Sequence, residues 1–374
     1  MTGASLHRKL RELEAQKIEL LTAALKRWFA ANARDLPWRR TRDPYAIWVS
    51  EIMLQQTQVK TVIPYWERWL SALPTLKAAA EVSPDKLHKL WEGLGYYTRV
   101  RNLQRAAQVI VAQHGGRFPE RFDDVLALPG IGRYTAGAIC SIAYNQPTPI
   151  LDGNVIRVLT RVFGIAENPK EKATNQRLWK LAEALVTAAA GAKKGRRPEN
   201  ACSHLNQSLM ELGALICTPR QAQCGVCPVR PHCVAFREDR VESLPNLGDR
   251  PTTTTRRFAA WVIERQGKFL VRQRPAGVVN AHLWEFPNVE LADAKIGAEA
   301  AFRSEFGVAA HGLAPLLAIR HSITRYRITV EAFRVDPGAA SVVVDGAVWK
   351  SRAQMRRLAF ASAHRKILGA LALR

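Results

Sequence analysis

The chain has 374 residues, a length that suggests about two domains. Its 55 Lys and Arg residues outnumber 32 Asp and Glu residues, which gives a formal charge of +23 and indicates a polyanionic partner. No apolar run approaches the roughly 18–20 residues that a bilayer-spanning helix needs, so the composition excludes a membrane-spanning protein.

Helical periodicity dominates the first part of the chain. Met1–Ala30 lacks the compact apolar segment of a signal peptide and predicts an amphipathic helix. Asp43 as N-cap and Pro44 at the first helical position begin a second predicted helix, which continues to Gln58 and carries Glu51. Residues 1–235 therefore predict an all-α domain, with further helices over 84–92, 102–113, 132–143, 155–163 and 176–189.

The composition changes after residue 235. Residues 236–256 contain prolines, glycine and four consecutive threonines, and predict a linker. Residues 257–374 predict a smaller α+β domain, with a β-hairpin at 258–263 and 268–272, strands at 316–323 and 326–334, and helices at 293–306 and 361–373. Within the first domain, Lys193–Pro198 predicts a basic loop that either is solvated or contacts phosphate.

Four of the six cysteines lie close together, in the order Cys217-x6-Cys224-x2-Cys227-x5-Cys233. Such clustering in a long chain without a signal peptide favours metal binding over disulfides. Four thiolates can hold either zinc or a [4Fe–4S] cluster. A single Cys-x-x-Cys flanked by lone cysteines differs from the paired motifs of zinc ribbons, so we favour the iron–sulfur cluster. The remaining cysteines fall in apolar helical patterns and are predicted to be core residues: Cys140 and Cys202.

A helix–hairpin–helix is predicted at about 118–145, around Leu128-Pro-Gly-Ile-Gly-Arg-Tyr-Thr-Ala136. Pro129 ends one helix, and Gly130 and Gly132 make a tight turn that leaves backbone N–H groups available to a phosphate oxygen. With Thr135 beside them in a strongly basic chain, we expect these residues to contact DNA. A plain turn between two helices is the alternative.

Two carboxylates have contrasting surroundings. Asp152 precedes a predicted helix, whose partial positive charge is expected to keep it ionised at neutral pH. Glu51 is followed by Ile52-Met-Leu54, and apolar surroundings would raise its pKa and let it keep a proton. Taken singly, Asp152 would be a helix cap and Glu51 part of a solvated face. Together they form the pattern of an enzyme that hydrolyses a glycosidic bond.

Over about residues 25–235 these motifs resemble the endonuclease III superfamily of DNA glycosylases. Segments 50–58, 93–97, 128–136 and 152–154 and the cysteine spacing closely resemble the A/G-specific adenine DNA glycosylases of that superfamily. The resemblance implies an enzyme that acts on double-stranded DNA in base excision repair, and we expect a monomer because one chain supplies both a catalytic and a recognition domain. It would flip out and excise adenine mispaired with 8-oxoguanine or guanine. Superfamily members that also cut the backbone carry a lysine where this chain has Tyr134, so the expected enzyme is monofunctional.

The resemblance also implies roles for individual residues. Glu51, kept protonated, would donate to N7 of adenine and then activate water. Ionised Asp152 would stabilise the oxocarbenium-like sugar or trap it covalently. Tyr134 and Asn154 would position these groups. The residues that match the adenine pocket are Arg34, Trp38, Arg39, Leu54, Val59 and Gln207, and those that match a wedge inserted into the duplex are Gln56 and Tyr96.

The C-terminal domain resembles the Nudix-like domain that recognises 8-oxoguanine in this family. A Nudix hydrolase binds Mg²⁺ through a dense acidic motif, of which this chain keeps only Arg303-Ser-Glu305-Phe-Gly307, so we expect a binding domain. The family usually presents Phe-Ser-His to the oxidised guanine. The matching residues here are Ile323, Thr324 and Arg325, of which Thr324 keeps a hydroxyl group.

Two alternatives stay open at this point. A bifunctional endonuclease III-like glycosylase and lyase would need a lysine near position 134, whereas a non-catalytic DNA-binding module would make Glu51 and Asp152 incidental. No protein partner is predicted. Because the sequence shows no export signal, we expect the protein in the cytoplasm with the nucleoid, or in a nucleus.

Overall fold

The computed structural model describes residues 3–191, 199–249, 252–292, 296–323, 325–336 and 342–372. The chain divides into two compact units, one formed by residues 1–81 and 102–249 and the other by residues 82–101 and 250–374. Two features of the sequence analysis, the basic loop at Lys193–Pro198 and Thr324, lie outside the described residues.

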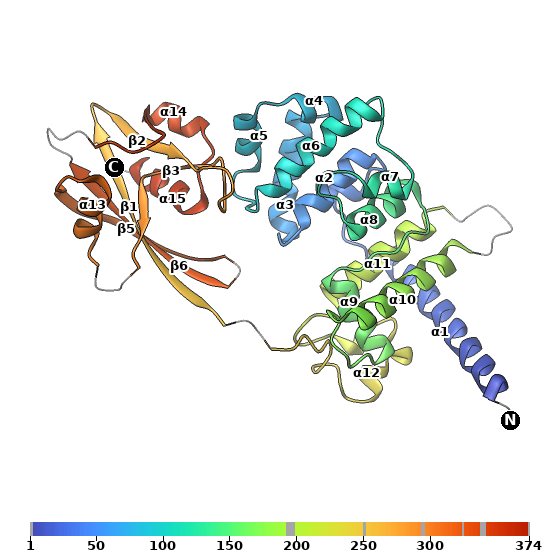
Figure 1. Ribbon diagram of the computed structural model, residues 1–374. Helices are drawn as coiled ribbons and strands as arrows, with labels where there is room; N and C mark the ends of the chain where they lie inside the picture. The colour runs from blue at the N-terminus through green and yellow to red at the C-terminus, as the bar shows by residue number, and fades with distance from the viewer. Residues whose placement is uncertain are drawn as a thin grey trace. The chain divides into compact units, whose positions relative to one another are not determined.

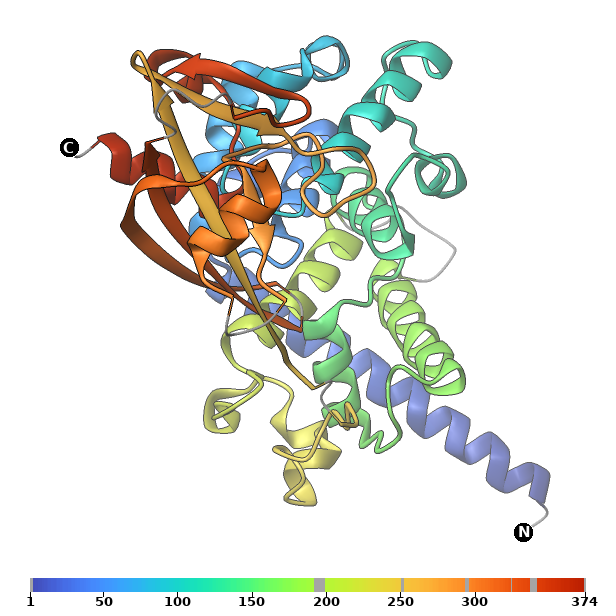
Figure 2. The ribbon, with the colours of Figure 1, turned by 60° about the vertical axis from the view of Figure 1, so that its left-hand side comes forward.

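The first unit consists of helices and loops throughout its described part (Figure 1). In both Figure 1 and Figure 2, the N-terminal half of α1 projects from the other helices of this unit. The α-helices are α1 (Gly3–Asn32), α2 (Pro44–Leu54), α3 (Val59–Ala72), α4 (Leu76–Glu81), α6 (Thr98–Gln113), α7 (Phe122–Leu126), α8 (Arg133–Tyr144), α9 (Gly153–Phe163), α10 (Lys172–Ala190), α11 (Ala201–Leu215) and α12 (Val234–Arg237). Short 3-10 helices are η1 (Pro37–Arg39), η2 (Cys224–Val226) and η3 (Arg230–His232).

The helix predicted over 43–58 is shorter than the sequence suggested. Asp43 caps α2 by accepting a hydrogen bond from the N–H of Tyr45 at 3.0 Å. The helix ends at Leu54, Gln56 adopts a left-handed φ of 57°, and Gln58 is the N-cap of α3. Gln58 therefore does not belong to the helix of Glu51, and the prediction was wrong there. The helical periodicity of α3 begins at Val59, only a few residues after α2 ends, so the two helices read as one in the sequence.

The buried core of the first unit supports the segments that carry the candidate catalytic residues. Apolar side chains of α1, α9, α10 and α11 form one cluster, which includes Leu25, Val158, Leu185 and Leu209. Cys202 belongs to the same cluster and Cys140 is fully buried, which confirms both as core residues. The start of α9 therefore rests on closely packed side chains.

The second unit combines a mixed β-sheet with helices. Its strands are β1 (Thr254–Arg265), β2 (Lys268–Gln273), β3 (Trp284–Glu285), β4 (Asn288–Glu290), β5 (His311–Ile323), β6 (Tyr326–Asp336) and β7 (Ala347–Ser351). The sheet order is β3-β2-β1-β6-β5, with β4 paired to β1 and β7 to β2. Only the β1–β6 pairing is parallel among these named pairs of the described strands. The helices are α5 (Pro84–Trp91), α13 (Ala298–Phe306), α14 (Arg352–Arg357) and α15 (Ser362–Ala372).

Helices cover both faces of this sheet. Alternate residues of β1 point to opposite sides: Ala260 and Val262 pack with α14 and α15, whereas Trp261 and Ile263 pack with α13 (Figure 1). The predicted α+β class and the β1–β2 hairpin are confirmed. β1 begins at Thr254, inside the predicted linker, because its β-branched threonines pair with β6. The predicted helix at 293–306 begins later, at Ala298, and residues 293–295 lie outside the described part.

Among the described helices, none is both long enough and apolar enough to span a membrane.

Candidate active site

Glu51 is a buried carboxyl group on an otherwise uncharged helix. Its residue is 5% exposed, and the hydroxyl of Tyr134 at the start of α8 donates to Glu51 Oε2 at 2.9 Å. Burial raises the pKa of Glu51 to about 7, and the negative charge of Asp152 adds to this rise, while the Tyr134 hydrogen bond opposes it. The site can therefore keep Glu51 protonated near neutral pH.

Asp152 occupies the N-cap of α9, close enough to Glu51 for their charges to interact. Its Oδ1 accepts the N–H of Val155 at 2.8 Å, and its Oδ2 accepts Asn154 Nδ2 at 2.9 Å. Burial nevertheless raises the pKa of Asp152, although these hydrogen bonds and the charge of Arg157 lower it. We predicted an ionised Asp152 from its place before a helix, and this position gave no sign that the carboxylate is buried. Asp152 accepts more hydrogen bonds than Glu51, and these bonds stabilise its ionised form. When the pair holds a single proton, that proton therefore resides mainly on Glu51.

Arg157 connects the partner of Asp152 to the cysteine-rich segment. Its Nη2 donates to Asn154 Oδ1 at 2.9 Å and to Gly213 O at 2.6 Å, and its Nε donates to Cys217 O at 2.6 Å. A Cβ on Gly213 would lie 2.6 Å from Asn154 Cβ, so glycine permits the close approach of α11 to α9. The sequence analysis did not identify Arg157, because an arginine in an amphipathic helix gives no sign of being buried.

A second buried carboxylate, Glu211 on α11, brings two predicted pocket residues together. Arg34 Nε and Nη2 donate to Glu211 at 2.8 and 2.7 Å, and Arg39 Nη1 and Nη2 donate to it at 3.0 and 2.9 Å. Arg39 Nε also donates to Gln207 Oε1 at 3.0 Å. Burial alone would raise the pKa of Glu211, but the hydrogen bonds from both arginines lower it to about 2. The positive charge of Arg39 also lowers the pKa of Glu51, which places this cluster beside the carboxyl pair.

Replacing Glu211 by glutamine is expected to destabilise the protein by about 3 kcal/mol at neutral pH, because it leaves two arginines without their buried counter-charge. Since the pKa of Glu211 is lowered in the folded state, its contribution is present above the ordinary glutamate pKa and is lost as the pH falls through about 4 towards 2. Urea unfolding of the variant and the wild type would measure both effects. Asp35→Asn is the control, because Asp35 pairs with Arg40 at the surface. Equal losses in both variants would refute the prediction.

The other predicted pocket residues lie in η1 and on either side of the break between α2 and α3. Trp38 lies next to Arg39 in η1, is 6% exposed and packs edge-on against Trp66 with ring centroids 6.1 Å apart. Leu54 ends α2 and Val59 begins α3, and both are half-buried. Between them, Gln56 is exposed on the left-handed turn. Tyr96, predicted as the second wedge residue, belongs to the other compact unit and is 44% exposed.

The predicted hairpin turn lies between α7 and α8. Gly130 has a φ of 75°, and a Cβ there would lie 2.5 Å from Asn102 Cβ, so this position requires glycine. Gly132 is the N-cap of α8, and open space surrounds the position of a Cβ there. Thr135 is only 3% exposed. The Thr135 side chain is therefore largely packed inside the protein.

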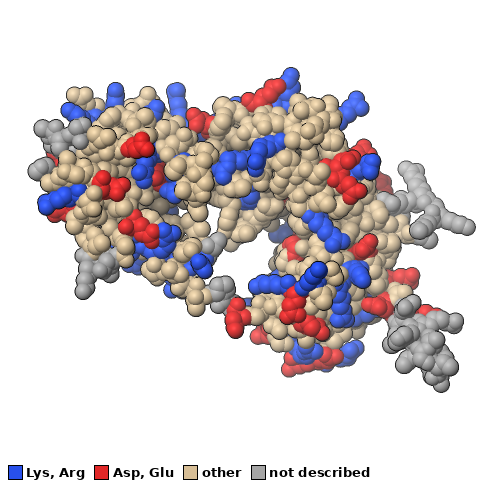
Figure 3. All heavy atoms as spheres, in the orientation of Figure 1, with Lys and Arg blue, Asp and Glu red and all other residues tan. Residues whose placement is uncertain are grey.

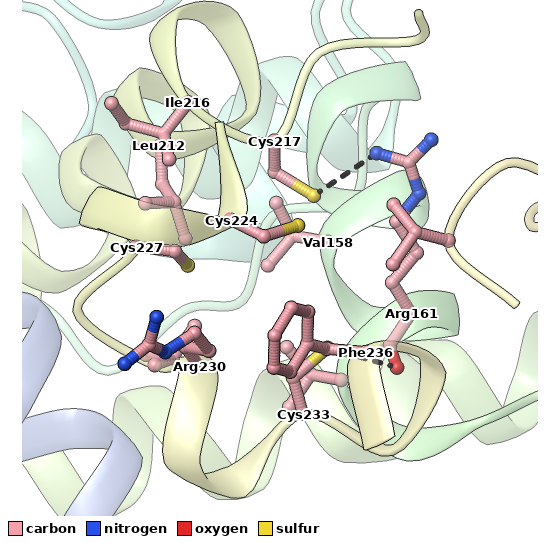
Figure 4. A pocket seen from close by; sticks show the side chains of 13 residues that line it. Val158, Arg161, Leu212, Ile216, Cys217, Cys224, Cys227, Arg230, Cys233 and Phe236 are labelled. Carbon is pink, nitrogen blue, oxygen red and sulfur yellow. Dashed lines mark hydrogen bonds between the residues drawn. The ribbon is translucent and has the colours of Figure 1, made fainter. Parts of the chain in front are cut away.

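The four clustered cysteines line one small cavity (Figure 4). Arg161 Nη1 donates to Cys217 Sγ at 3.4 Å and to Thr218 O at 2.8 Å, while Cys233 Sγ donates to Arg161 O at 3.5 Å. Arg230 also lines the cavity, together with apolar side chains such as Val158 and Phe236. Within the described ranges, no three His, Cys, Asp or Glu side chains lie close enough together to hold a single metal ion.

Two residues of the predicted lesion-recognition segment, Ile323 and Arg325, are described where β5 ends and β6 begins. Ile323 ends β5 and pairs with Tyr326, which begins β6. Arg325 Nη2 donates to the Tyr326 hydroxyl at 3.1 Å, and the guanidinium groups of Arg325 and Arg256 lie 5.2 and 5.4 Å from the centre of the Tyr326 ring. The sequence analysis missed Tyr326, because nothing in the sequence indicated that two arginines flank it.

Basic side chains are distributed over both units. On the face shown in Figure 3, Lys and Arg are interspersed with Asp and Glu and are not confined to one end of the chain. On this face, therefore, positive side chains lie where they can meet a polyanion.

Comparison with known proteins supports these observations. Residues 49–184 match the HhH-GPD superfamily of base excision DNA repair proteins, and residues 258–370 match the NUDIX domain. The chain is 35% identical to the adenine DNA glycosylase of Rattus norvegicus over 403 aligned positions, which cover 91% of this chain and 75% of that protein. The chain belongs to the adenine DNA glycosylase family. The adenine DNA glycosylase of Buchnera aphidicola subsp. Schizaphis graminum (strain Sg) is 36% identical over 73% of this chain and 76% of its own.

Among solved structures, a thermostable thymine-DNA glycosylase matches 60% of this chain and 98% of its own, with a TM-score of 0.53 and 28% identity. The predicted superfamily and the two-domain fold class are thus confirmed. Membership of the adenine DNA glycosylase family also makes this chain an enzyme of base excision repair rather than a DNA-binding module without catalysis.

Proposed function

We propose that this chain is a monofunctional DNA glycosylase that hydrolyses the N-glycosidic bond of adenine mispaired with 8-oxoguanine or guanine in double-stranded DNA. The observation that carries the proposal is the buried pair of Glu51 and Asp152, with Tyr134 hydrogen-bonded to Glu51. Tyr134 has no amine with which to form a Schiff base, so the product is an abasic site. Because one chain carries both units, the enzyme acts as a monomer. It works in the compartment that contains the DNA.

In this mechanism Glu51 is the general acid. Adenine leaves poorly as an anion, so protonation of N7 by Glu51 lowers the barrier to breaking the bond. The raised pKa of Glu51, about 7, supplies the proton at neutral pH. Once the proton has gone to the base, the Glu51 carboxylate can accept a proton from the water that attacks the sugar. Tyr134 holds Glu51 in place through its hydroxyl.

Asp152 supplies negative charge to the sugar in the same mechanism. The oxocarbenium-like transition state is positive, and a carboxylate held in place beside it costs no reorganisation during the reaction. Asn154 fixes Asp152 Oδ2, and Arg157 fixes Asn154. Glu211 holds Arg34 and Arg39 together, and Arg39 also binds Gln207. The flipped adenine is bound by these residues and by apolar neighbours: Arg34, Arg39, Gln207, Trp38, Leu54 and Val59. Gln56 and Tyr96 fill the space that the base leaves in the duplex.

We further propose that Cys217, Cys224, Cys227 and Cys233 hold a [4Fe–4S] cluster. Four cysteine sulfurs that line one cavity suit this group, and their order in the sequence differs from that of zinc ribbons. Arg161 and Arg230 would offset its negative charge. The cluster would cross-link the segment 217–233 and present positive side chains to the DNA backbone, and Gly130 and Gly132 would contact the backbone through the hairpin turn.

Loss of one ligand should reveal this cluster directly. Cys227→Ser is expected to reduce the bound iron to less than half of the wild-type content and to lower the melting temperature by more than about 5 °C, because a ligand of a cross-linking group is removed. Iron analysis and thermal melting would measure these changes. Cys140→Ala is the control. Cys140 lies outside the cavity, so this variant protein should keep its full iron content. Wild-type protein that contains zinc and no iron would overturn the assignment.

The second unit would recognise the base opposite adenine. Ile323 and Arg325 lie where β5 ends and β6 begins, and the exposed Arg325 lies against Tyr326. A cation and an aromatic ring side by side can contact a base and its phosphate. We therefore assign the preference for 8-oxoguanine over guanine to contacts made by the β5–β6 hairpin.

Single-turnover reactions on matched duplexes test the proposed function. Adenine would be placed opposite 8-oxoguanine, guanine, cytosine or thymine, and strand breaks would be scored with and without hot alkali. The expected result is free adenine, fastest opposite 8-oxoguanine, with breaks only after alkali. Breaks without alkali would show a lyase, and tight binding without adenine release would show a DNA-binding module.

A further inference from the structure

Glu92 connects the segment after α5 to the C-terminal part of the second unit. Its side chain is 10% exposed, and Glu92 Oε1 accepts the N–H of Phe360 at 2.9 Å. Lys89 Nζ donates to Glu92 Oε2 at 2.6 Å and to Leu358 O at 3.0 Å. Arg365 Nη1 donates to the backbone oxygen of Glu92 at 3.4 Å. Three hydrogen bonds therefore join two segments that are far apart in the sequence, and the Lys89–Glu92 pair lies within the first of them.

The segment that receives Glu92 is held firmly in its own domain. Phe360 is fully buried in the core between the sheet and α15. On either side of it, Trp284 N donates to Ala359 O at 2.9 Å and Ala361 N donates to Trp284 O at 3.0 Å. Phe360 thus offers its N–H from a fixed position, and the geometry of the bond to Glu92 is determined by the core of the C-terminal domain.

The loop that follows Glu92 has little freedom of its own and displays Tyr96. Gly93, Gly95 and Tyr96 have positive φ angles of 111°, 70° and 48°. Trp91 Nε1 donates to Gly95 O at 3.0 Å, and Arg99 Nη2 donates to the same oxygen at 3.1 Å. Because the loop is rigid internally and begins at the residue after Glu92, its orientation depends on how Glu92 is held.

We propose that Glu92 is a positioning residue that fixes the Tyr96 loop to the C-terminal domain and thereby makes the choice of mispair depend on this contact. The inference rests on the proposed function, in which the C-terminal domain recognises the opposite base and Tyr96 enters the duplex. A buried carboxylate that binds both an N–H and an ammonium group maintains one loop orientation. Without the Glu92 carboxylate, the orientation of Tyr96 in the duplex no longer depends on the domain that recognises the opposite base.

The experiment compares single-turnover adenine release opposite 8-oxoguanine and opposite guanine. Glu92→Ala is expected to lower the ratio of the two rates by about tenfold, the effect of losing a buried charged hydrogen bond. Glu92→Gln is expected to have a smaller effect, since it still accepts the Phe360 N–H but cannot pair with Lys89. The control is Glu81→Ala, which removes an exposed carboxylate paired with Lys77 at 3.9 Å and should leave the ratio unchanged.

A double variant tests whether Glu92 acts through the loop. In a Tyr96→Ala background, Glu92→Ala should change the ratio no further, and 2-aminopurine beside the mispair should report the same loss of unstacking in the single and double variants. Thermal melting identifies general destabilisation, and Lys89→Gln, at a side chain that is 36% exposed, gives the same comparison if Glu92→Ala melts at the assay temperature.

Additive effects of Glu92→Ala and Tyr96→Ala, or an unchanged ratio in folded Glu92→Ala, would overturn the inference and leave the proposed function intact. If the wild type released no adenine from either duplex, the proposed function itself would fail.

Discussion

Glu51→Gln is expected to slow adenine release by about a thousandfold while leaving DNA affinity unchanged, because glutamine has the shape of glutamate but no acidic proton. Glu51 is the only charged residue of α2, and Tyr134 already donates to its carboxyl group. A glutamine at this position keeps an acceptor for Tyr134 and loses only the proton transfer. Single-turnover kinetics and a binding titration with the same duplex would separate the two effects.

The matched control for this variant is Glu67→Gln, because Glu67 lies exposed on α3 near the same region of the sequence. It should leave both rate and affinity unchanged. If Glu51→Gln kept more than about a tenth of the wild-type rate, the assignment of Glu51 as general acid would be wrong.

The same substitution is expected to stabilise the folded protein at alkaline pH. Folding raises the pKa of Glu51 to about 7, so the folded state binds its proton more tightly than the unfolded state. The stability due to this proton is present below the ordinary glutamate pKa and is lost as the pH rises through about 7. Glutamine loses nothing over this range, and the difference approaches about 3 kcal/mol. Unfolding curves at several pH values would show whether the two proteins diverge as the pH rises from about 4.5 to about 7 and then stay apart at higher pH.

Asp152→Asn is expected to reduce the single-turnover rate by about 10²–10³-fold with little change in stability. Asparagine can still accept the N–H of Val155 and cap α9, but it removes the charge that faces the sugar. Asp152→Ala should lose the cap as well and cost about 1 kcal/mol of stability in addition.

Asp43→Asn is the matched control for Asp152→Asn, because Asp43 caps α2 in the same way through the N–H of Tyr45. It should change neither rate nor stability appreciably. A rate loss of similar size in both cap variants would mean that Asp152 acts only by holding the helix in place.

Much of the fold was predictable because it depends on local patterns. The N-cap and proline before α2, the helical periodicity of the first unit and the strand alternation in β1 and β2 all depend on neighbouring residues. The break after Leu54 was not predictable in this way, since Gln55 to Gln58 are polar residues that a helix also accepts. The late start of α13 likewise depends on how Gly297 enters the domain.

The candidate site was only partly predictable, for a different physical reason. Glu51 and Asp152 were found because their sequence neighbours differ, but the burial that raises the pKa of Asp152 comes from distant elements. Glu211 and Arg157 are charged residues on amphipathic helices, and only the packing of α11 against α9 shows that they are buried. Thr135 shows the reverse case, a polar residue predicted at the surface that the fold buries.

In the proposed mechanism, Glu51 holds the catalytic proton at neutral pH. The most direct test is the pH dependence of adenine release under single-turnover conditions with enzyme below saturation, which reports the ionisation of the free enzyme. The rate is expected to fall about tenfold for each pH unit above about 7, because Glu51 loses its proton there. A rate that stayed constant from about pH 6 to about pH 9 would contradict this role of Glu51.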